Sequence, residues 1–165
     1  MVYSVLPRSH VEGLPGNDSP FDPPKTFALK MIDKRVVTRD KKIHEVHCER
    51  IVLQHLNHEA IPKLYCSFHD TNKLYFLMEH IQNGTLADFM NRERIISVDM
   101  TRFFIAHLLK CLEYLHGEGI AHRDLKPGNL LFDDNMYIKV IDFATAKVLN
   151  PTLSASIPKR PVTNH

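Results

Sequence analysis

One segment of the sequence constrains this chain more than any other. Residues 122–129 read His-Arg-Asp-Leu-Lys-Pro-Gly-Asn and bring a carboxylate (Asp124), an ammonium (Lys126) and an amide (Asn129) together within six residues. A second carboxylate, Asp142, follows 18 residues after Asp124. Carboxylate and amide oxygens are ligands that magnesium prefers, and an ammonium neutralises phosphate charge. An isolated Asp-Leu-Lys is usually a surface turn, but the four groups in this order favour a site for phosphate chemistry.

Composition and charge exclude several classes of protein. The 165 residues are enough for one domain, and 44% hydrophobic with 24% charged residues is typical of a soluble globular chain. A net charge of +2 gives no electrostatic reason to expect nucleic-acid binding. The sequence contains no run of 18 apolar residues, so it predicts no membrane segment. Cys48, Cys66 and Cys111 are widely spaced and indicate reduced thiols, so we expect an intracellular, cytoplasmic protein.

The hydrophobic pattern predicts strands first and helices later. Short apolar runs predict strands at residues 26–32, 64–68, 73–78 and 137–141. Helical spacing of apolar residues predicts helices at 40–56 and 98–116, with Ser97 as the cap of the second. Residues 7–25 hold five prolines and predict a loop, whereas 149–165 lose the periodicity and predict a flexible tail. The order of elements predicts an α+β fold in two unequal lobes.

Residues 122–129 match the catalytic-loop pattern of eukaryotic-type protein kinases at every fixed position. Lys126, two residues after the aspartate, is the mark of serine/threonine kinases. The chain resembles the AGC group, and it is most similar to the phosphoinositide-dependent protein kinases. That similarity lies in the run LEYLHGEGIAHRDLKPGNLLF, in KLYF, and in TAKVL at residues 145–149. The resemblance implies a partial kinase domain over 1–148, with 7–25 as an inserted loop and 149–165 as the start of an activation segment.

This protein-kinase-like fold would have a small β-rich N-lobe with one long helix and the start of a mainly helical C-lobe. The resemblance implies four catalytic residues. Asp124 would accept the proton of the substrate hydroxyl, and Lys126 would contact the transferred phosphate. Lys30 would pair with the α- and β-phosphates of ATP, while Glu49, 19 residues later on a predicted helix, would hold Lys30 in place. A solvated strand lysine is the simpler interpretation of Lys30 alone, but this spacing suits a strand, a loop and a helix.

The resemblance also implies sites for magnesium and ATP. Asn129 and Asp142 would bind Mg2+. Met78 would close the back of the ATP pocket, and the hinge would begin at Glu79. The positions expected to contact the nucleotide are Val2, Ala28, Lys30, Met78, Glu79, Ile81, Thr85 and Leu131. Leu53, Leu64, His122 and Phe143 resemble the stacked column that joins the two lobes. The apolar members of both sets would be ordinary core residues whether or not a nucleotide binds.

The chain departs from the family pattern in several places. No G-x-G-x-x-G precedes Lys30, although residues 2–5 resemble the strand that follows that loop. The family's Ala-Pro-Glu motif does not follow Asp142. Ala144 stands where glycine is usual, Gly128 where glutamate is frequent, and Thr85 where a ribose-binding glutamate is common. We therefore expect a chain truncated at both ends, with weak or absent catalysis.

These residues lead to two functional hypotheses. The first is a serine/threonine protein kinase that transfers the γ-phosphate of ATP, with Mg2+, to protein hydroxyls, impaired in this truncated chain. Its partners would be ATP and a protein substrate, with no nucleic acid and no membrane segment. The alternative is a catalytically inactive, kinase-like binding or scaffold protein. The absent glycine-rich loop favours the alternative, while Lys30, Glu49, Asp124, Asn129 and Asp142 together favour the enzyme. An incomplete gene product is a third interpretation.

Overall fold

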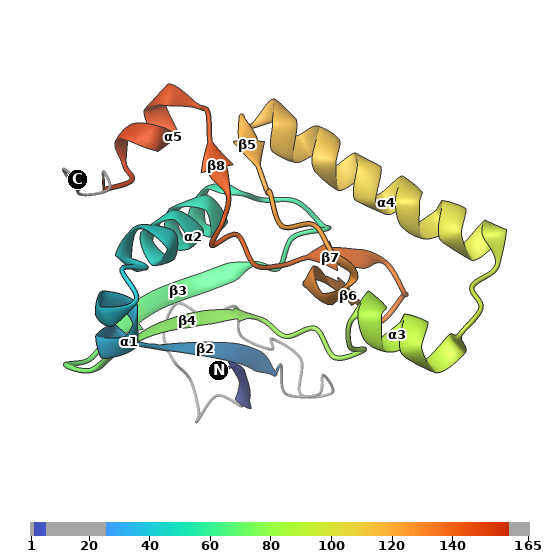
Figure 1. Ribbon diagram of the computed structural model, residues 1–165, viewed down its shortest axis with the longest axis horizontal. Helices are drawn as coiled ribbons and strands as arrows, with labels where there is room; N and C mark the ends of the chain where they lie inside the picture. The colour runs from blue at the N-terminus through green and yellow to red at the C-terminus, as the bar shows by residue number, and fades with distance from the viewer. Residues whose placement is uncertain (1, 6–25, 159–165) are drawn as a thin grey trace, which may run out of the picture.

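The computed structural model describes residues 2–5 and 26–158, so the loop predicted at 7–25 lies outside the described residues. The first lobe is a four-stranded antiparallel sheet in the order β1-β2-β4-β3 (Figure 1). Its strands are β1 (Val2–Val5), β2 (Phe27–Asp33), β3 (Leu64–His69) and β4 (Lys73–Glu79). The register places Val2 opposite Lys30 and Ala28 opposite Met78. The strands predicted at 26–32, 64–68 and 73–78 are therefore confirmed.

A short helix precedes the one that was predicted at residues 40–56. Helix α1 (Lys34–Arg39) begins directly after β2, where the Asp33 carboxylate accepts the N–H of Arg35 at 2.8 Å. Lys41, with φ of 55°, interrupts the helical path, and α2 (Ile43–His55) follows. The prediction of a helix beginning at residue 40 is thus wrong by three residues, and α1 was not predicted. Helix α2 buries Glu49, so a carboxylate points into the fold.

The second lobe combines helices with two short sheets. Helix α3 (Leu86–Glu93) precedes the long α4 (Val98–Gly117), which confirms the helix predicted at 98–116. As predicted, Ser97 caps α4, its Oγ accepting the N–H of Met100 at 3.2 Å. The remaining elements are β5 (Ile120–Ala121), the 3-10 turn η1 (Pro127–Asn129), β6 (Leu130–Phe132), β7 (Ile138–Val140), β8 (Lys147–Val148) and α5 (Pro151–Ala155). Strand β5 pairs with β8, and β6 pairs with β7.

A short helix forms in the segment expected to be a flexible tail. Asn150 caps α5 by accepting the N–H groups of Thr152 and Leu153 at 3.1 and 3.3 Å. Five residues are too few to show a helical period in the sequence, so only the Asn-Pro start signalled it. No helix within the described ranges is long and apolar enough to cross a membrane.

One hydrophobic core joins the two lobes. Val52 of α2, Leu115 of α4, Val140 of β7 and Phe143 are each completely buried in it. The predicted column is present: Leu53 and Phe143 belong to this core, and Leu64 packs against it. The fourth member, His122, places its ring centroid 4.9 Å from that of Phe143. Because α2 packs into the same core as β6 and β7, the residues of both lobes are held in a fixed relation.

Candidate active site

An ion pair links β2 to α2 in the first lobe. The ammonium of Lys30 lies 2.5 Å from Oε1 of Glu49. The Glu49 side chain is 3% exposed and that of Lys30 is 24% exposed, so the lysine is the member that reaches toward solvent. The neighbouring Cys48 Sγ lies 3.5 Å from the carbonyl oxygen of Ala146, which anchors α2 on the segment after Asp142. The contact predicted from the 19-residue spacing therefore forms.

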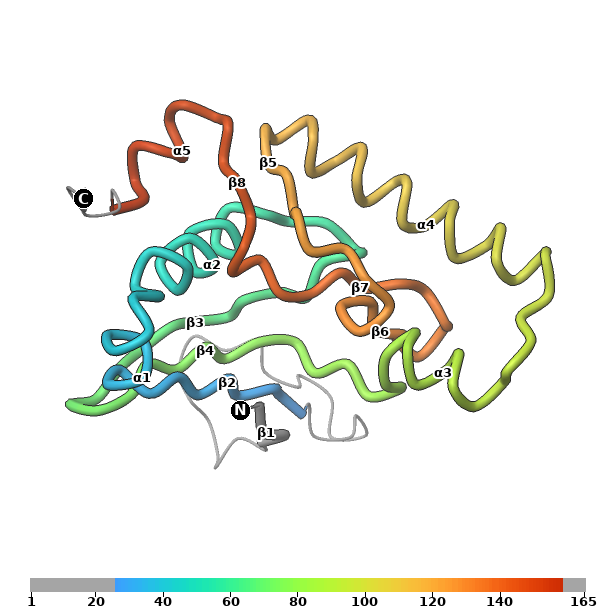
Figure 2. Tube along the Cα trace, in the orientation of Figure 1, coloured from blue at the N-terminus to red at the C-terminus, as the bar shows by residue number. Residues whose placement is uncertain are grey.

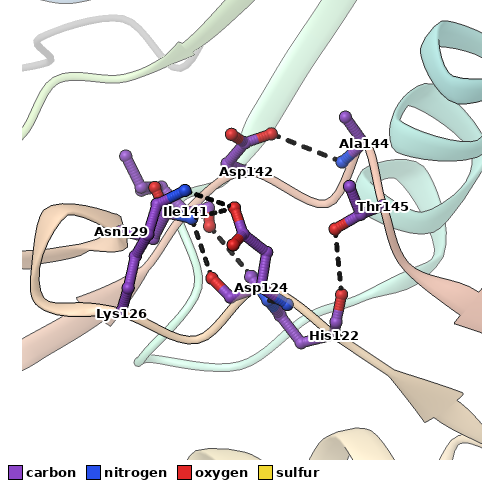
Figure 3. Close-up of polar contacts among 8 residues, drawn as sticks. All are labelled: His122, Asp124, Lys126, Asn129, Ile141, Asp142, Ala144 and Thr145. Atoms are coloured by element: carbon purple, nitrogen blue, oxygen red, sulfur yellow. Dashed lines mark hydrogen bonds and ion pairs between the residues drawn. The ribbon is translucent and has the colours of Figure 1, made fainter.

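The loop between β5 and β6 brings two of the predicted polar groups, those of Lys126 and Asn129, to the carboxylate of Asp124. Oδ2 of Asp124 accepts a hydrogen bond from Lys126 Nζ at 2.7 Å and from Asn129 Nδ2 at 2.9 Å. Asn129 Nδ2 also donates to the Asp124 carbonyl at 2.9 Å (Figure 3). The hydrogen bond from Lys126 lowers the pKa of Asp124, with a smaller contribution from Asn129. The same contact raises the pKa of Lys126, so both groups are charged at neutral pH.

Backbone strain marks the two ends of this site. Arg123 and Asp142 have φ angles of 70° and 67°, in the left-handed region that residues other than glycine rarely adopt. His122 holds them together: its Nε2 donates to the Ile141 carbonyl at 2.9 Å, while Nδ1 accepts the N–H of Asp124 at 3.3 Å. The imidazole therefore carries its proton on Nε2. This histidine links the loop to the residue immediately before Asp142.

Asp142 lies on the same side of the site as the Asp124 cluster. Figure 3 shows the side chains of Asp124, Asn129 and Asp142 close together, and the Asp142 charge also contributes to the raised pKa of Lys126. Asp142 Oδ1 accepts the N–H of Ala144 at 3.4 Å. The alanine has a negative φ, so this conformation does not use the freedom of the family's glycine.

The donor set at this site fits magnesium. The amide nitrogen of Asn129 donates its hydrogen bonds to Asp124. The amide oxygen of Asn129 therefore remains as a ligand atom beside the Asp142 carboxylate. Magnesium is commonly held by one or two protein oxygens together with substrate phosphates. Across residues 26–158, no three His, Cys, Asp or Glu side chains form a group that could hold a metal without such help.

Arg123 holds the segment that follows Asp142. Its Nε donates to the carbonyl of Thr145 at 2.7 Å, and Nη2 lies 3.5 Å from that of Ala146. The guanidinium also lines a cavity of about 620 Å3, whose wall includes Lys147 and Ser154. The Arg123 side chain thus contacts this segment rather than the Asp124 cluster.

The structure places the predicted nucleotide positions around the connection between the lobes. Ala28 and Met78 are register partners on β2 and β4, and Leu131 on β6 forms an isolated bridge with Thr85. The Thr85 hydroxyl donates to Asp88 Oδ2 at 2.6 Å and accepts the Asp88 N–H at 3.1 Å, which caps α3. This hydroxyl is engaged within the protein, so its predicted ribose contact would compete with the cap.

The other nucleotide positions differ in how far the structure describes them. Ile81 lies in the segment after β4, and Val2 is placed by backbone pairing with Lys30. Glu79 turns its carboxylate to Lys139 Nζ, at 2.6 Å. Lys139 was missed from the sequence, because a lysine between two apolar residues is the ordinary pattern of a strand with one exposed face.

Comparisons with known proteins agree with this arrangement. The human 3-phosphoinositide-dependent protein kinase 1 is 42% identical over 127 residues, which are 77% of this chain and 23% of that protein. The human putative 3-phosphoinositide-dependent protein kinase 2 is also 42% identical over 127 residues, or 77% of this chain and 32% of the relative. The Arabidopsis thaliana 3-phosphoinositide-dependent protein kinase 1 is 40% identical over 132 residues, or 80% and 27%.

This chain spans only 23% to 32% of the length of these three relatives. The family described as the protein kinase domain matches residues 22–163, which include the Lys30–Glu49 pair, the Asp124 cluster and Asp142. The chain belongs to the protein kinase family.

Proposed function

We propose that this chain is a serine/threonine protein kinase that transfers the γ-phosphate of ATP to protein hydroxyls. The observation that carries the proposal is the Asp124 carboxylate held between Lys126 and Asn129, beside Asp142. Phosphoryl transfer depends on positioning and charge neutralisation more than on covalent participation by the protein. A carboxylate, an ammonium and two oxygen ligands in one place supply both requirements.

Each residue has a defined role in this proposal. Asp124 orients the substrate hydroxyl and takes its proton, while the new bond forms between the hydroxyl oxygen and the γ-phosphorus. The bond from that phosphorus to the bridging oxygen of ADP breaks, and Lys126 stabilises the charge on the transferred group. Lys30, oriented by Glu49, contacts the α- and β-phosphates. Mg2+, held by Asn129 and Asp142, supplies neutralisation of phosphate charge when bound.

The nucleotide base is proposed to lie between β2 and β6. Ala28 and Leu131 contact its two faces, and the backbone from Glu79 to Ile81 forms hydrogen bonds with its edge. These positions are supported by the pairing of β2 with β4 and by the bridge that brings Leu131 beside Thr85. Val2 belongs to the same proposal through its pairing with Lys30.

The cellular setting is also a proposal. We infer a cytoplasmic protein of the AGC group that acts in signalling on protein substrates with serine or threonine hydroxyls. The wide spacing of the three cysteines in the sequence, Cys48, Cys66 and Cys111, supports a reducing compartment.

Phosphate transfer to a generic basic protein tests the proposal. We expect labelled phosphate from ATP to appear on serine or threonine in a magnesium-dependent way. Asp124→Asn should reduce the rate at least about 100-fold, since a positioned proton acceptor contributes roughly that much or more. Asp134→Asn is the matched control, because this exposed aspartate lies in the turn between β6 and β7 and should retain full activity. Magnesium-dependent ATP binding without any transfer would refute the enzyme and favour the scaffold hypothesis.

A further inference from the structure

One ion pair outside the Asp124 cluster joins three segments of the chain. Lys139 Nζ on β7 lies 2.6 Å from Oε1 of Glu79, the last residue of β4. The other oxygen of the same carboxylate accepts the N–H of Lys63 at 3.1 Å, and the Glu79 N–H donates to the Lys63 carbonyl at 2.8 Å. Glu79 thereby connects the end of β4 both to the residue before β3 and to β7 in the other lobe.

Burial makes this pair more than a surface contact. The Lys139 side chain is 10% exposed, whereas the side chain of Glu79 is 31% exposed. Its neighbours on β7, Ile138 and Val140, are 2% and 0% exposed. A buried ammonium without a partner is strongly unfavourable, so the position of Lys139 depends on Glu79. Most exposed ion pairs, in contrast, contribute little to a fold.

The pair also lies beside the proposed floor of the nucleotide site. Lys139 is the register partner of Leu131 in the antiparallel pairing of β6 with β7. Side chains of directly opposed residues project from the same face of such a sheet. The ammonium therefore fixes Glu79, where the connection between the lobes begins, next to the strand that carries Leu131.

A second contact reinforces the same junction. Figure 2 shows the turn between α2 and β3 reaching toward β7, and there the Val140 N–H donates to the Ala60 carbonyl at 2.8 Å. The chain that leaves β4 then passes β6, where the Phe132 N–H donates to the Gly84 carbonyl at 3.1 Å. Two adjacent residues of β7 thus contact the chain before β3 and the chain at the end of β4: Val140 bonds Ala60, and Lys139 pairs with Glu79.

We propose that Glu79 and Lys139, together with the backbone N–H of Lys63, form a hinge clamp that fixes the backbone of residues 79–84. Glu79 and Lys139 are then positioning residues, which hold the hydrogen-bonding groups of Glu79 and Ile81 in the arrangement that adenine requires. The effect on nucleotide rests on the proposed function, whereas the effect on the backbone does not. A preorganised site binds more tightly because less ordering is needed on binding.

Three variants separate the clamp from general stability. Lys139→Met keeps most of the length of the side chain but removes its charge, and Lys139→Arg keeps the charge. Glu79→Gln keeps the shape of the acid and removes its charge. Arg102→Gln is the control, because Arg102 forms an ion pair with Asp99 at 3.1 Å in which both side chains are largely exposed, at 76% and 92%.

Two measurements are made on each variant: amide hydrogen exchange of residues 79–84 without nucleotide, and the affinity for ADP with magnesium. In Lys139→Met we expect exchange to become about tenfold faster at 79–84, since local opening becomes easier when a local contact is lost. The ADP dissociation constant should rise by roughly threefold or more, as expected when preorganisation is lost. In folded Glu79→Gln, exchange at 79–84 and the ADP dissociation constant should rise in the same way. In Lys139→Arg and Arg102→Gln, both quantities should match those of the unaltered chain.

Each outcome decides a separate part of the inference. Unchanged exchange at 79–84 in Lys139→Met would overturn the clamp. Faster exchange with unchanged ADP affinity would overturn its positioning role. If the unaltered chain binds no ADP, the proposed function fails, and the exchange data alone decide the clamp.

Discussion

The buried pair of Lys30 and Glu49 predicts an asymmetry between the two single substitutions that remove it. Lys30→Met leaves the Glu49 carboxylate, 3% exposed, without its cation inside the fold. Loss of one partner from a buried pair costs about 3–5 kcal/mol, so we expect a cost of about 3 kcal/mol here. Glu49→Gln leaves only the Lys30 ammonium, 24% exposed, which can turn toward water, and its expected cost is about 1 kcal/mol.

Urea unfolding measures both changes as shifts of the transition midpoint at constant slope. For a slope of about 1.5 kcal/mol/M, a loss of about 3 kcal/mol lowers the midpoint by about 2 M. The double variant Lys30→Met with Glu49→Leu should recover most of that loss, because two apolar side chains leave no buried charge. Equal costs for the two single variants, or no recovery in the double variant, would refute this reasoning.

Three further predictions concern stability and reactivity away from the pair. Hydrogen bonds from Tyr75 and from the N–H groups of Lys73 and Asn72 lower the pKa of Asp70 to about 2, so its stabilisation should be complete above about pH 4. It should be lost as the pH falls toward 2, and Asp70→Asn should remove this part of the pH dependence of the urea midpoint. Burial raises the pKa of Cys111 to about 12, so a thiol reagent should label exposed Cys66 in the folded protein and leave Cys111 unlabelled until urea is added. Gly119 has φ of 69°, and a Cβ there would meet the Asn150 nitrogen at 3.0 Å, so Gly119→Ala should cost about 1–3 kcal/mol. Gly117→Ala, whose Cβ would meet nothing within 4 Å, should cost less than about 0.5 kcal/mol in the same melt, and equal effects would contradict the assignment of strain to Gly119.

Much of the fold could be predicted because its signals are local. Helix α4 has a strong apolar period and a serine cap, and the strands of the first sheet are short apolar runs with a turn between β3 and β4. Helices α1 and α3 were missed because six and eight residues show too little periodicity. Their starts were nevertheless visible in retrospect, as Asp33 before α1 and the Thr85–Asp88 capping box before α3.

The site also contains contacts that local sequence signals predict and contacts that they do not. Asp124, Lys126 and Asn129 lie within one loop, so their spacing alone predicts that they meet, and the Lys30–Glu49 spacing suits a strand followed by a helix. The contact between Glu79 and Lys139 joins residues 60 apart, and no periodic pattern connects them. Such a pairing depends on how the two lobes pack. The roles of the nucleotide positions, including Val2, Ile81 and Thr85, remain predictions.

Magnesium-dependent nucleotide binding tests most directly the claim that these residues form a phosphate-handling site. The melting temperature is measured with ATP, with and without magnesium, for the unaltered chain, Asp142→Asn and the control Asp134→Asn. At ATP 100-fold above its dissociation constant, binding adds about 2.7 kcal/mol, which raises the melting temperature by several degrees. We predict this rise for the unaltered chain and for Asp134→Asn, and its loss in Asp142→Asn. The absence of any magnesium-dependent rise, or an equal rise in Asp142→Asn, would contradict the claim.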